Sequence, residues 1–167
     1  MSEKRDLRSL NIDELGEMLA ALGAPKFRTK QVYAWLQSGV SSFDGMTNVP
    51  KSLRAQLNEI GYIAVAEVEA RFDSKLDETV KYLFKLHDGL LIESVVMKYH
   101  HGYSICISTQ VGCRMGCSFC ASTINGLARS LTAGEMLAQI TSASENLGVR
   151  ISNVVLMGEP FDNYDNV

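Results

Sequence analysis

Three of the four cysteines in this 167-residue chain fall within one short stretch, residues 110–120, which reads Gln-Val-Gly-Cys-Arg-Met-Gly-Cys-Ser-Phe-Cys. They are Cys113, Cys117 and Cys120. Thiolates are soft ligands that suit iron–sulfur clusters and zinc, so three of them on one loop can hold a single metal centre. The spacing differs from that of bacterial ferredoxins, and a closed cluster needs four ligands. We therefore expect a cluster with one open iron.

Two other interpretations of this loop stay open on the residues alone. Zinc prefers four ligands, and Cys106 is available as the fourth. A disulfide is less well supported, because nothing else in the chain indicates secretion. We favour the cluster because the spacing is more specific than that of a single cysteine pair.

The segments around the loop predict an α/β fold. A strand is expected over residues 104–108, and Thr132 with Glu135 forms a capping box that begins a helix ending at Gly148. A short apolar strand follows over residues 151–157. Strand, loop, helix and strand make a parallel unit with the cysteines at the carboxyl end of the first strand, where α/β folds place their active sites. The second strand leads into Gly158-Glu159-Pro160, which would lie beside the cysteine loop.

The chain before the loop divides into two further regions. Apolar residues at helical spacing, with a capping box at Asn11 and Glu14, predict a helical accessory domain over residues 1–61. Alternating residues predict strands over residues 62–104, with a hairpin turn at Asp88-Gly89. Residues 105–167 would then form the α/β part. Glu93 is a carboxylate inside an apolar strand, so it is either an exposed or paired strand residue or a catalytic base.

Charge and hydropathy limit the possible partners. The formal net charge of −3 argues mildly against nucleic acid, although Lys26, Arg28 and Lys30 cluster near Tyr33 and Trp35. A solvated helix face beside a packed aromatic also explains that cluster. No stretch approaches the roughly 20 apolar residues of a membrane span, and we find no signal peptide. We expect a cytoplasmic protein with no membrane partner, where thiols stay reduced.

The cysteine spacing, with Phe119 before the last cysteine, resembles the radical S-adenosylmethionine enzymes. Further motifs are similar to one family among them, the dual-specificity RNA methyltransferases that modify carbon 2 of adenosine. The motifs are Pro25 to Arg28 with Gln31, Tyr33 and Trp35, then residues 41–50, 106–110, 131–135 and 163–166. The resemblance implies a truncated, partial (β/α) barrel that follows a helical domain that helps to hold RNA.

The resemblance also implies a mechanism and a set of partners. Cys113, Cys117 and Cys120 would hold a 4Fe-4S cluster, and S-adenosylmethionine would occupy its open iron, with Gly158 and Glu159 at its amino group. A 5′-deoxyadenosyl radical would activate a methyl group carried on another cysteine. Glu93 would accept the ring proton, and Cys106 would release the product by forming a disulfide. The implied partners are 23S rRNA, tRNA and an electron donor such as flavodoxin or ferredoxin, and the full-length enzyme would be a monomer.

This sequence departs from the family pattern in three ways. No cysteine follows Cys120, so the methyl-carrying cysteine is missing. The chain ends at Val167, after the second predicted strand of the parallel unit, and we expect an incomplete fragment that is not competent alone. The segment Met157-Gly158-Glu159 is two residues shorter than the family pattern. The alternatives are another radical S-adenosylmethionine enzyme, including one that methylates carbon 8, and a non-catalytic module that binds metal or RNA.

Overall fold

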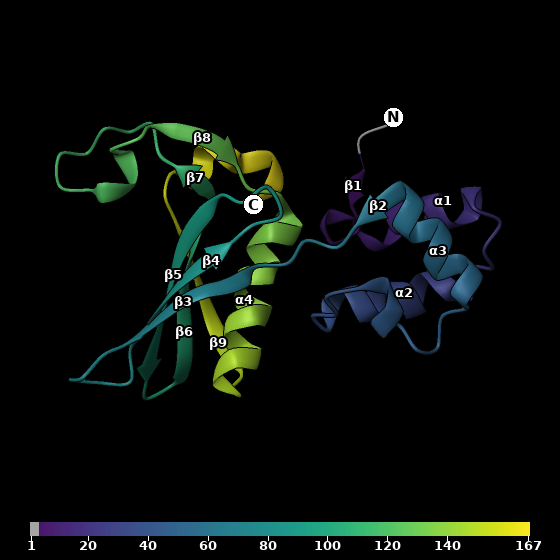
Figure 1. Cartoon of the computed structure of the whole chain (residues 1–167), viewed down its shortest axis with the longest axis horizontal. Coiled ribbons are helices and arrows are strands. Elements are labelled where there is room, and N and C mark those ends of the chain that lie inside the picture. Colours follow the sequence, from purple (N-terminus) through teal and green to yellow (C-terminus); the bar gives the residue numbers. More distant parts are fainter. Residues whose placement is uncertain (1–3) are drawn as a thin grey trace. The chain divides into compact units, whose positions relative to one another are not determined.

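The computed structural model describes residues 4–167, which divide into two compact units, one up to Ala64 and the other from Val65 to Val167 (Figure 1). The predicted division at residues 61 and 104 differs from this one. Strand β6 (Gly102–Ser108) crosses the second predicted boundary, and its neighbours in one sheet come from both sides of it. Hydrogen bonding between distant strands therefore joins residues 65–104 to the segments that follow.

The first unit contains the three predicted helices around its own core. Asn11 caps the first helix, and Glu14 returns a hydrogen bond to the Asn11 backbone, so the predicted capping box is confirmed. The second helix begins at Phe27. A short parallel pair of strands, which was not predicted, joins the two ends of the unit. The elements are β1 (Arg5–Asp6), η1 (Leu7–Ser9), α1 (Ile12–Ala21), α2 (Phe27–Gln37), η2 (Phe43–Gly45), α3 (Lys51–Ile60) and β2 (Gly61–Tyr62).

The second unit is built on a five-stranded sheet in the order β3-β4-β5-β6-β9. Neighbouring strands are antiparallel except β6 and β9, which are parallel. The Asp88-Gly89 turn is confirmed, and Gly89 adopts φ 81°, which favours glycine. The elements around β6 are β3 (Glu67–Asp73), β4 (Val80–Lys85), β5 (Leu91–Tyr99), β7 (Gln110–Gly112), η3 (Ala121–Thr123), β8 (Leu127–Ser130), α4 (Ala133–Leu147), β9 (Ile151–Met157) and η4 (Pro160–Asn166).

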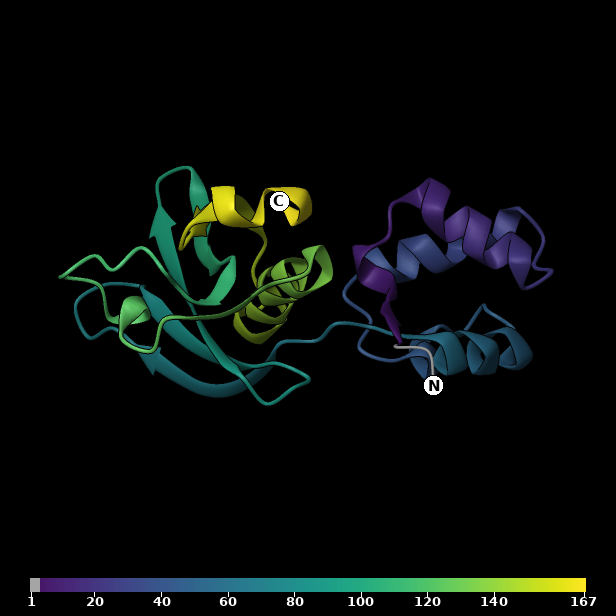
Figure 2. The same ribbon diagram turned by 90° about the horizontal axis from the view of Figure 1, so that it is seen from above.

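Helix α4 covers one face of this sheet and links β6 to β9, as the sequence predicts (Figures 1 and 2). Thr132 and Glu135 form its capping box, and Gly148 ends it in the left-handed conformation. The core between sheet and helix includes Tyr82, Phe84, Val96, Ile105 and Ile107 from the strands, with Met136, Ala138 and Ala143 from the helix. The opposite face of the sheet carries Glu93 and Cys106 and contributes no buried core of this kind.

Two short strands outside the main sheet were not predicted. Strand β7 pairs with β8 in an antiparallel hairpin, and the loop between them contains all three clustered cysteines. Strands of three and four residues are too short to show a clear alternation in the sequence. Within residues 4–167, no helix has the length and apolar character that crossing a membrane requires.

Candidate active site

Glu93 and Cys106 lie on the same face of the sheet, on neighbouring strands. The register pairs Val95 of β5 with Cys106 of β6, and the Ser108 hydroxyl donates a 2.7 Å hydrogen bond to the Glu93 carbonyl. Because side chains alternate along a strand, Glu93, Val95 and Cys106 point to one side. Twelve residues lie between Glu93 and Cys106 in the sequence, and the antiparallel pairing of β5 with β6 brings the two side chains to one face.

The Glu93 carboxylate is exposed and paired with a lysine on the next strand. Its Oε1 lies 2.6 Å from the Lys81 Nζ. The simpler of the two predictions for Glu93 was an exposed or paired strand residue, and the side chain is both. The ion pair with Lys81 does not argue against the second prediction, a catalytic base, because a solvent-exposed pair contributes little stability and separates easily. The carboxylate therefore remains accessible to a substrate on this face.

Cys106 is half-buried between the central strand and the sheet edge. Its register partners are Val95 on β5 and Val155 on β9. Its thiol is free, as are those of the other three cysteines, so no disulfide joins any of the four. A reduced thiol on an open sheet face is a possible nucleophile, since the thiolate is the attacking species in sulfur chemistry.

The cysteine loop is closed at its base by a close approach of two backbone segments. The Cys113 amide donates a 3.1 Å hydrogen bond to the Gly126 carbonyl. Gly112 adopts φ 76°, and a Cβ at this position would lie 2.0 Å from the Gly126 oxygen. Only glycine fits there without moving the backbone. Gly112 thus sets where the loop leaves the sheet.

The three cysteines differ in exposure along this loop. Cys113 is buried, Cys120 is intermediate and Cys117 is exposed. Phe119 is 92% exposed. Within residues 4–167, no three His, Cys, Asp or Glu side chains form a group that could hold a metal ion. The three thiols share a loop without converging, and Cys106 is not grouped with them.

The donor chemistry of this loop nevertheless fits an iron–sulfur cluster. Three free thiols lie within eight residues, and at least one of them is open to solvent. The loop between Cys113 and Gly126 has hydrogen bonds mainly at its base and around Cys120, where the Cys120 amide donates to the Cys117 carbonyl at 3.0 Å. Soft thiolates on a loop of this kind suit a cluster that organises its own ligands.

The segment after β9 lies against the start of the cysteine hairpin. The backbone amide and hydroxyl of Thr109 both donate to the Met157 carbonyl, at 3.1 and 2.8 Å. Gly158 follows with φ 94°, and a Cβ there would lie 3.3 Å from the Thr109 hydroxyl. Glu159 is half-buried at the start of η4. Gly158 and Glu159 are therefore next to the strand that leads into the cysteines, as the parallel unit predicts.

An ion pair ties the cysteine loop to η4. The Arg114 guanidinium binds the Asp162 carboxylate through two nitrogens, and the Nε–Oδ2 distance is 2.7 Å. Its hydrogen bonds and charge hold the pKa of Asp162 below the ordinary aspartate value. Gln110 lies near enough to lower that pKa slightly, but its buried amide makes no hydrogen bond of ordinary geometry to a described residue.

Asn163 fixes the same region from inside. It is buried, and its Nδ2 donates to the carbonyls of Thr109 and Leu131, at 2.9 and 2.8 Å. One side chain therefore joins η4, the start of the cysteine hairpin and the segment before α4. In the sequence Asn163 stands out only as part of the motif at residues 163–166, because a local pattern gives no sign of contacts that span 54 and 32 residues.

Arg129 anchors the other strand of the hairpin. It makes two 2.8 Å hydrogen bonds to the buried Glu135 carboxylate and one to Asp88. The hydrogen bond to Glu135 is the main reason that the pKa of Arg129 is raised. Burial raises the pKa of Asp88, but hydrogen bonds from the Leu90 amide and Arg129 outweigh it and lower that pKa. The network joins β8, α4 and the β4–β5 turn.

Gln139 holds the end of β6 from the covering helix. This fully buried side chain accepts from the Ser108 amide at 2.9 Å and donates to the Ser108 carbonyl at 2.9 Å. It also accepts from the Ser94 hydroxyl. Sequence reasoning missed Gln139, Arg114 and Arg129, and the only available signal was a glutamine among the apolar positions of α4.

Known proteins resemble both units. A family model described as the ribosomal RNA large subunit methyltransferase N-terminal domain matches residues 5–63. A probable dual-specificity RNA methyltransferase RlmN from Alkaliphilus oremlandii is 56% identical over 165 residues, which are 98% of this chain and 48% of the relative. One with the same description from Lachnoclostridium phytofermentans is 52% identical over 170 residues, covering 99% of this chain and 48% of the relative.

A solved structure gives the same result for the fold. The crystal structure of a radical SAM methyltransferase from Sphaerobacter thermophilus matches with a TM-score of 0.87 and 40% identity. The match covers 97% of this chain and 49% of that protein. The chain spans about half the length of the curated relatives it matches.

Proposed function

Because this chain belongs to the dual-specificity RNA methyltransferase family, we propose that it contributes the cluster-holding part of a radical S-adenosylmethionine enzyme. The proposed reaction is methylation of carbon 2 of adenosine in 23S rRNA and in tRNA. The observation that carries this proposal is the placement of Glu93 and Cys106 on one open sheet face. That face belongs to the sheet whose parallel strands β6 and β9 end beside the cysteine hairpin.

The cysteine loop supplies the proposed cofactor ligands. Cys113, Cys117 and Cys120 would hold a 4Fe-4S cluster, and Gly158 with Glu159 would contact S-adenosylmethionine. When bound, the cluster supplies the electron that cleaves S-adenosylmethionine. The support is chemical: three thiolates leave one coordination position for a ligand, and a half-buried carboxylate suits a cationic amino group. Phe119 would lie beside this site by its position in the loop.

The residues of the sheet face take the proton and sulfur steps of the proposed mechanism. The Glu93 carboxylate would accept the proton lost from the adenine ring, after releasing Lys81. The Cys106 thiolate would attack the sulfur of a thioether that links RNA to a second cysteine. The sulfur–sulfur bond would form as the sulfur–carbon bond breaks, and the carbon would keep the electron pair and take up a proton, so that the RNA leaves with a methyl group. No cysteine after Cys120 is present in this sequence to act as that second residue.

The proposed partners follow the same reasoning. The basic residues Lys26, Arg28 and Lys30 on or beside α2 support a contact between the helical unit and RNA phosphates. An electron donor such as flavodoxin or ferredoxin would reduce the cluster. We place the enzyme in the cytoplasm, where its thiols stay reduced, and expect the full-length protein to be a monomer.

Metal analysis of single-cysteine variants tests the ligand assignment. After anaerobic reconstitution the protein should contain about four iron and four sulfide per chain, since that is the composition of the cluster. Cys113→Ala, Cys117→Ala and Cys120→Ala should each lose it. Cys106→Ala is the matched control and should keep it. Stoichiometric zinc that disappears in Cys106→Ala would establish the zinc site instead and contradict the proposal.

A further inference from the structure

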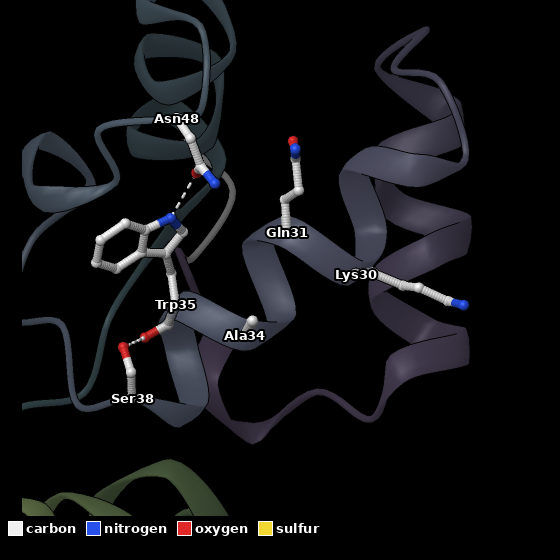
Figure 3. A pocket seen from close by; sticks show the side chains of 6 residues that line it. All are labelled: Lys30, Gln31, Ala34, Trp35, Ser38 and Asn48. Carbon is white, nitrogen blue, oxygen red and sulfur yellow. Dashed lines mark hydrogen bonds between the residues drawn. The ribbon is translucent and has the colours of Figure 1, made fainter.

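A pocket of about 430 Å³ lies within the helical unit, between α2 and the loop before α3. It is a shallow hollow that is mostly open to solvent, so it suits one flat ring laid against its wall rather than an enclosed ligand. Its lining combines an indole, a small side chain and polar groups (Figure 3). The lining residues are Lys30, Gln31, Ala34, Trp35, Ser38 and Asn48.

The indole of Trp35 is held in a fixed orientation. Its Nε1 donates a 2.6 Å hydrogen bond to Asn48 Oδ1, the contact drawn in Figure 3. Arg28 holds Gln31 and Asn48, two other lining residues, because one of its nitrogens donates to Gln31 Oε1 at 2.6 Å and to the Asn48 carbonyl at 3.0 Å. Part of the indole packs on the core of the unit, and the ring is only half-buried. The pocket is therefore formed before any ligand arrives.

The groups that remain available in the pocket match a nucleobase. The hydrogen bonds described above use the oxygens of Gln31 and Asn48, and neither amide nitrogen donates to another described residue. A flat aromatic wall stacks with a base, and amide donors suit the carbonyl and ring-nitrogen acceptors on its edge. No acidic residue lines the pocket.

The charge near the pocket suits the backbone of a nucleic acid. Lys30 is exposed and extends into solvent from the edge of the pocket away from the indole (Figure 3). Arg28 lies on the same helix, and its guanidinium sits 4.7 Å from the centre of the exposed Phe27 ring. A base in the pocket would place its phosphates beside this basic helix, where they neutralise charge.

We propose that this pocket binds one unpaired base of RNA, stacked on Trp35, with Lys30 beside the neighbouring phosphate. This rests on the proposed function, since it assigns a site for the RNA substrate on the helical unit. It requires a single-stranded loop or bulge, because the bases of a duplex are already stacked on one another and their faces are not accessible.

Fluorescence of Trp35 tests the proposal directly, because it is the only tryptophan in the chain. The probe is a hairpin RNA with an unpaired loop of adenosines, and the control is a blunt duplex of the same stem. Titration of the hairpin should quench the emission, and the duplex should not. A hairpin that binds by anisotropy without changing the emission would overturn the proposal, as would a hairpin that does not bind.

Variants separate stacking from a purely structural role of the indole. Trp35→Ala should weaken hairpin binding roughly fivefold to a hundredfold, the effect expected for one stacked base, whereas Trp35→Tyr should retain most of the affinity. Lys30→Ala should weaken binding and reduce its salt dependence, and Lys75→Ala, which removes an exposed charge in the other unit, should not. Circular dichroism verifies that each variant is folded. Equal affinities of Trp35→Ala and Trp35→Tyr in folded protein would contradict stacking.

A failure of the pocket assignment can be told apart from a failure of the proposed function. The cluster ligands lie on residues 113–120 of the second unit, and none of the pocket variants alters them. If the pocket variants bind RNA normally while the cluster assembles on the three cysteines, the pocket assignment alone is wrong. If the pocket binds the hairpin and no cluster assembles, the enzyme assignment is wrong.

Discussion

Replacing Gly112 with alanine should open the base of the cysteine loop, whereas the same change at Gly116 should not. Both glycines have left-handed backbone, with φ 76° and 68°. That conformation costs a residue with a side chain about 1–2 kcal/mol. At Gly112 the new Cβ would also lie 2.0 Å from the Gly126 carbonyl oxygen, whereas nothing lies within 4 Å at Gly116. The two variants thus share the conformational strain and differ in the clash.

The clash adds a second loss at Gly112. The Gly126 carbonyl must move, which breaks its hydrogen bond from the Cys113 amide, worth about 1 kcal/mol net. We expect the free energy of unfolding to fall by about 2–3 kcal/mol in Gly112→Ala and by about 1–2 kcal/mol in Gly116→Ala, a difference of about 1 kcal/mol. Urea denaturation measures both values on the protein without metal.

Cluster assembly gives a second measure of the same perturbation. Gly112→Ala displaces Cys113 relative to the other two cysteines, so it should bind less iron after reconstitution than Gly116→Ala. Equal losses of stability in the two variants would refute the reasoning. So would normal iron content in Gly112→Ala, because the closed base of the loop would then be unimportant for the ligands.

Three further perturbations follow from the networks around the hairpin. Arg129→Met leaves the buried Glu135 carboxylate without its main partner and should cost about 3 kcal/mol in urea denaturation, whereas a loss below about 1 kcal/mol would mean that the pair is not needed. The pKa of Asp162 is lower in the folded state than its ordinary value of 3.8, so its pairing with Arg114 stabilises the fold above pH 3.8, and this stabilisation is lost as the pH falls through the folded pKa. The midpoint of thermal unfolding, measured between pH 2 and 6, should therefore depend less on pH in Asp162→Asn. An unchanged pH dependence in this variant would contradict the argument. Asn163→Ala removes two buried hydrogen bonds, one to the Leu131 carbonyl and one to the Thr109 carbonyl, which still accepts from the Leu131 amide. It should destabilise by about 2 kcal/mol, against well under 1 kcal/mol for Asn166→Ala, and equal values would argue against a stabilising role of the buried Asn163 side chain.

Local signals predicted much of this fold. The capping boxes at Asn11 and Thr132 act within one helical turn, so the sequence alone contains the whole interaction. Strand β9 has the predicted bounds, because its apolar run from Val154 to Met157 ends at a glycine. The Asp88-Gly89 turn likewise depends on two adjacent residues. The parallel unit followed from the order of these elements.

Interactions between distant residues could not be predicted in the same way. Arg129 contacts Asp88 across 41 residues, and Asn163 contacts Thr109 across 54. The residues next to Arg129 and Asn163 in the sequence do not indicate which distant residues these side chains contact. Glu93 and Cys106 share a face only in the observed strand register. An error of one residue in the predicted register would place one of the two side chains on the opposite face. The chemical roles of Glu93 and Cys106 could be proposed from the sequence, whereas their relative positions could be seen only in the structure.

The most direct test of the central claim is electron paramagnetic resonance of the reconstituted, reduced protein with and without S-adenosylmethionine. If Cys113, Cys117 and Cys120 hold the cluster, one iron stays open, so we predict a 4Fe-4S signal that changes when S-adenosylmethionine is added. Glu159→Gln should weaken that response without removing the cluster. A cluster signal that is indifferent to S-adenosylmethionine, or a protein that binds only zinc, would contradict the account.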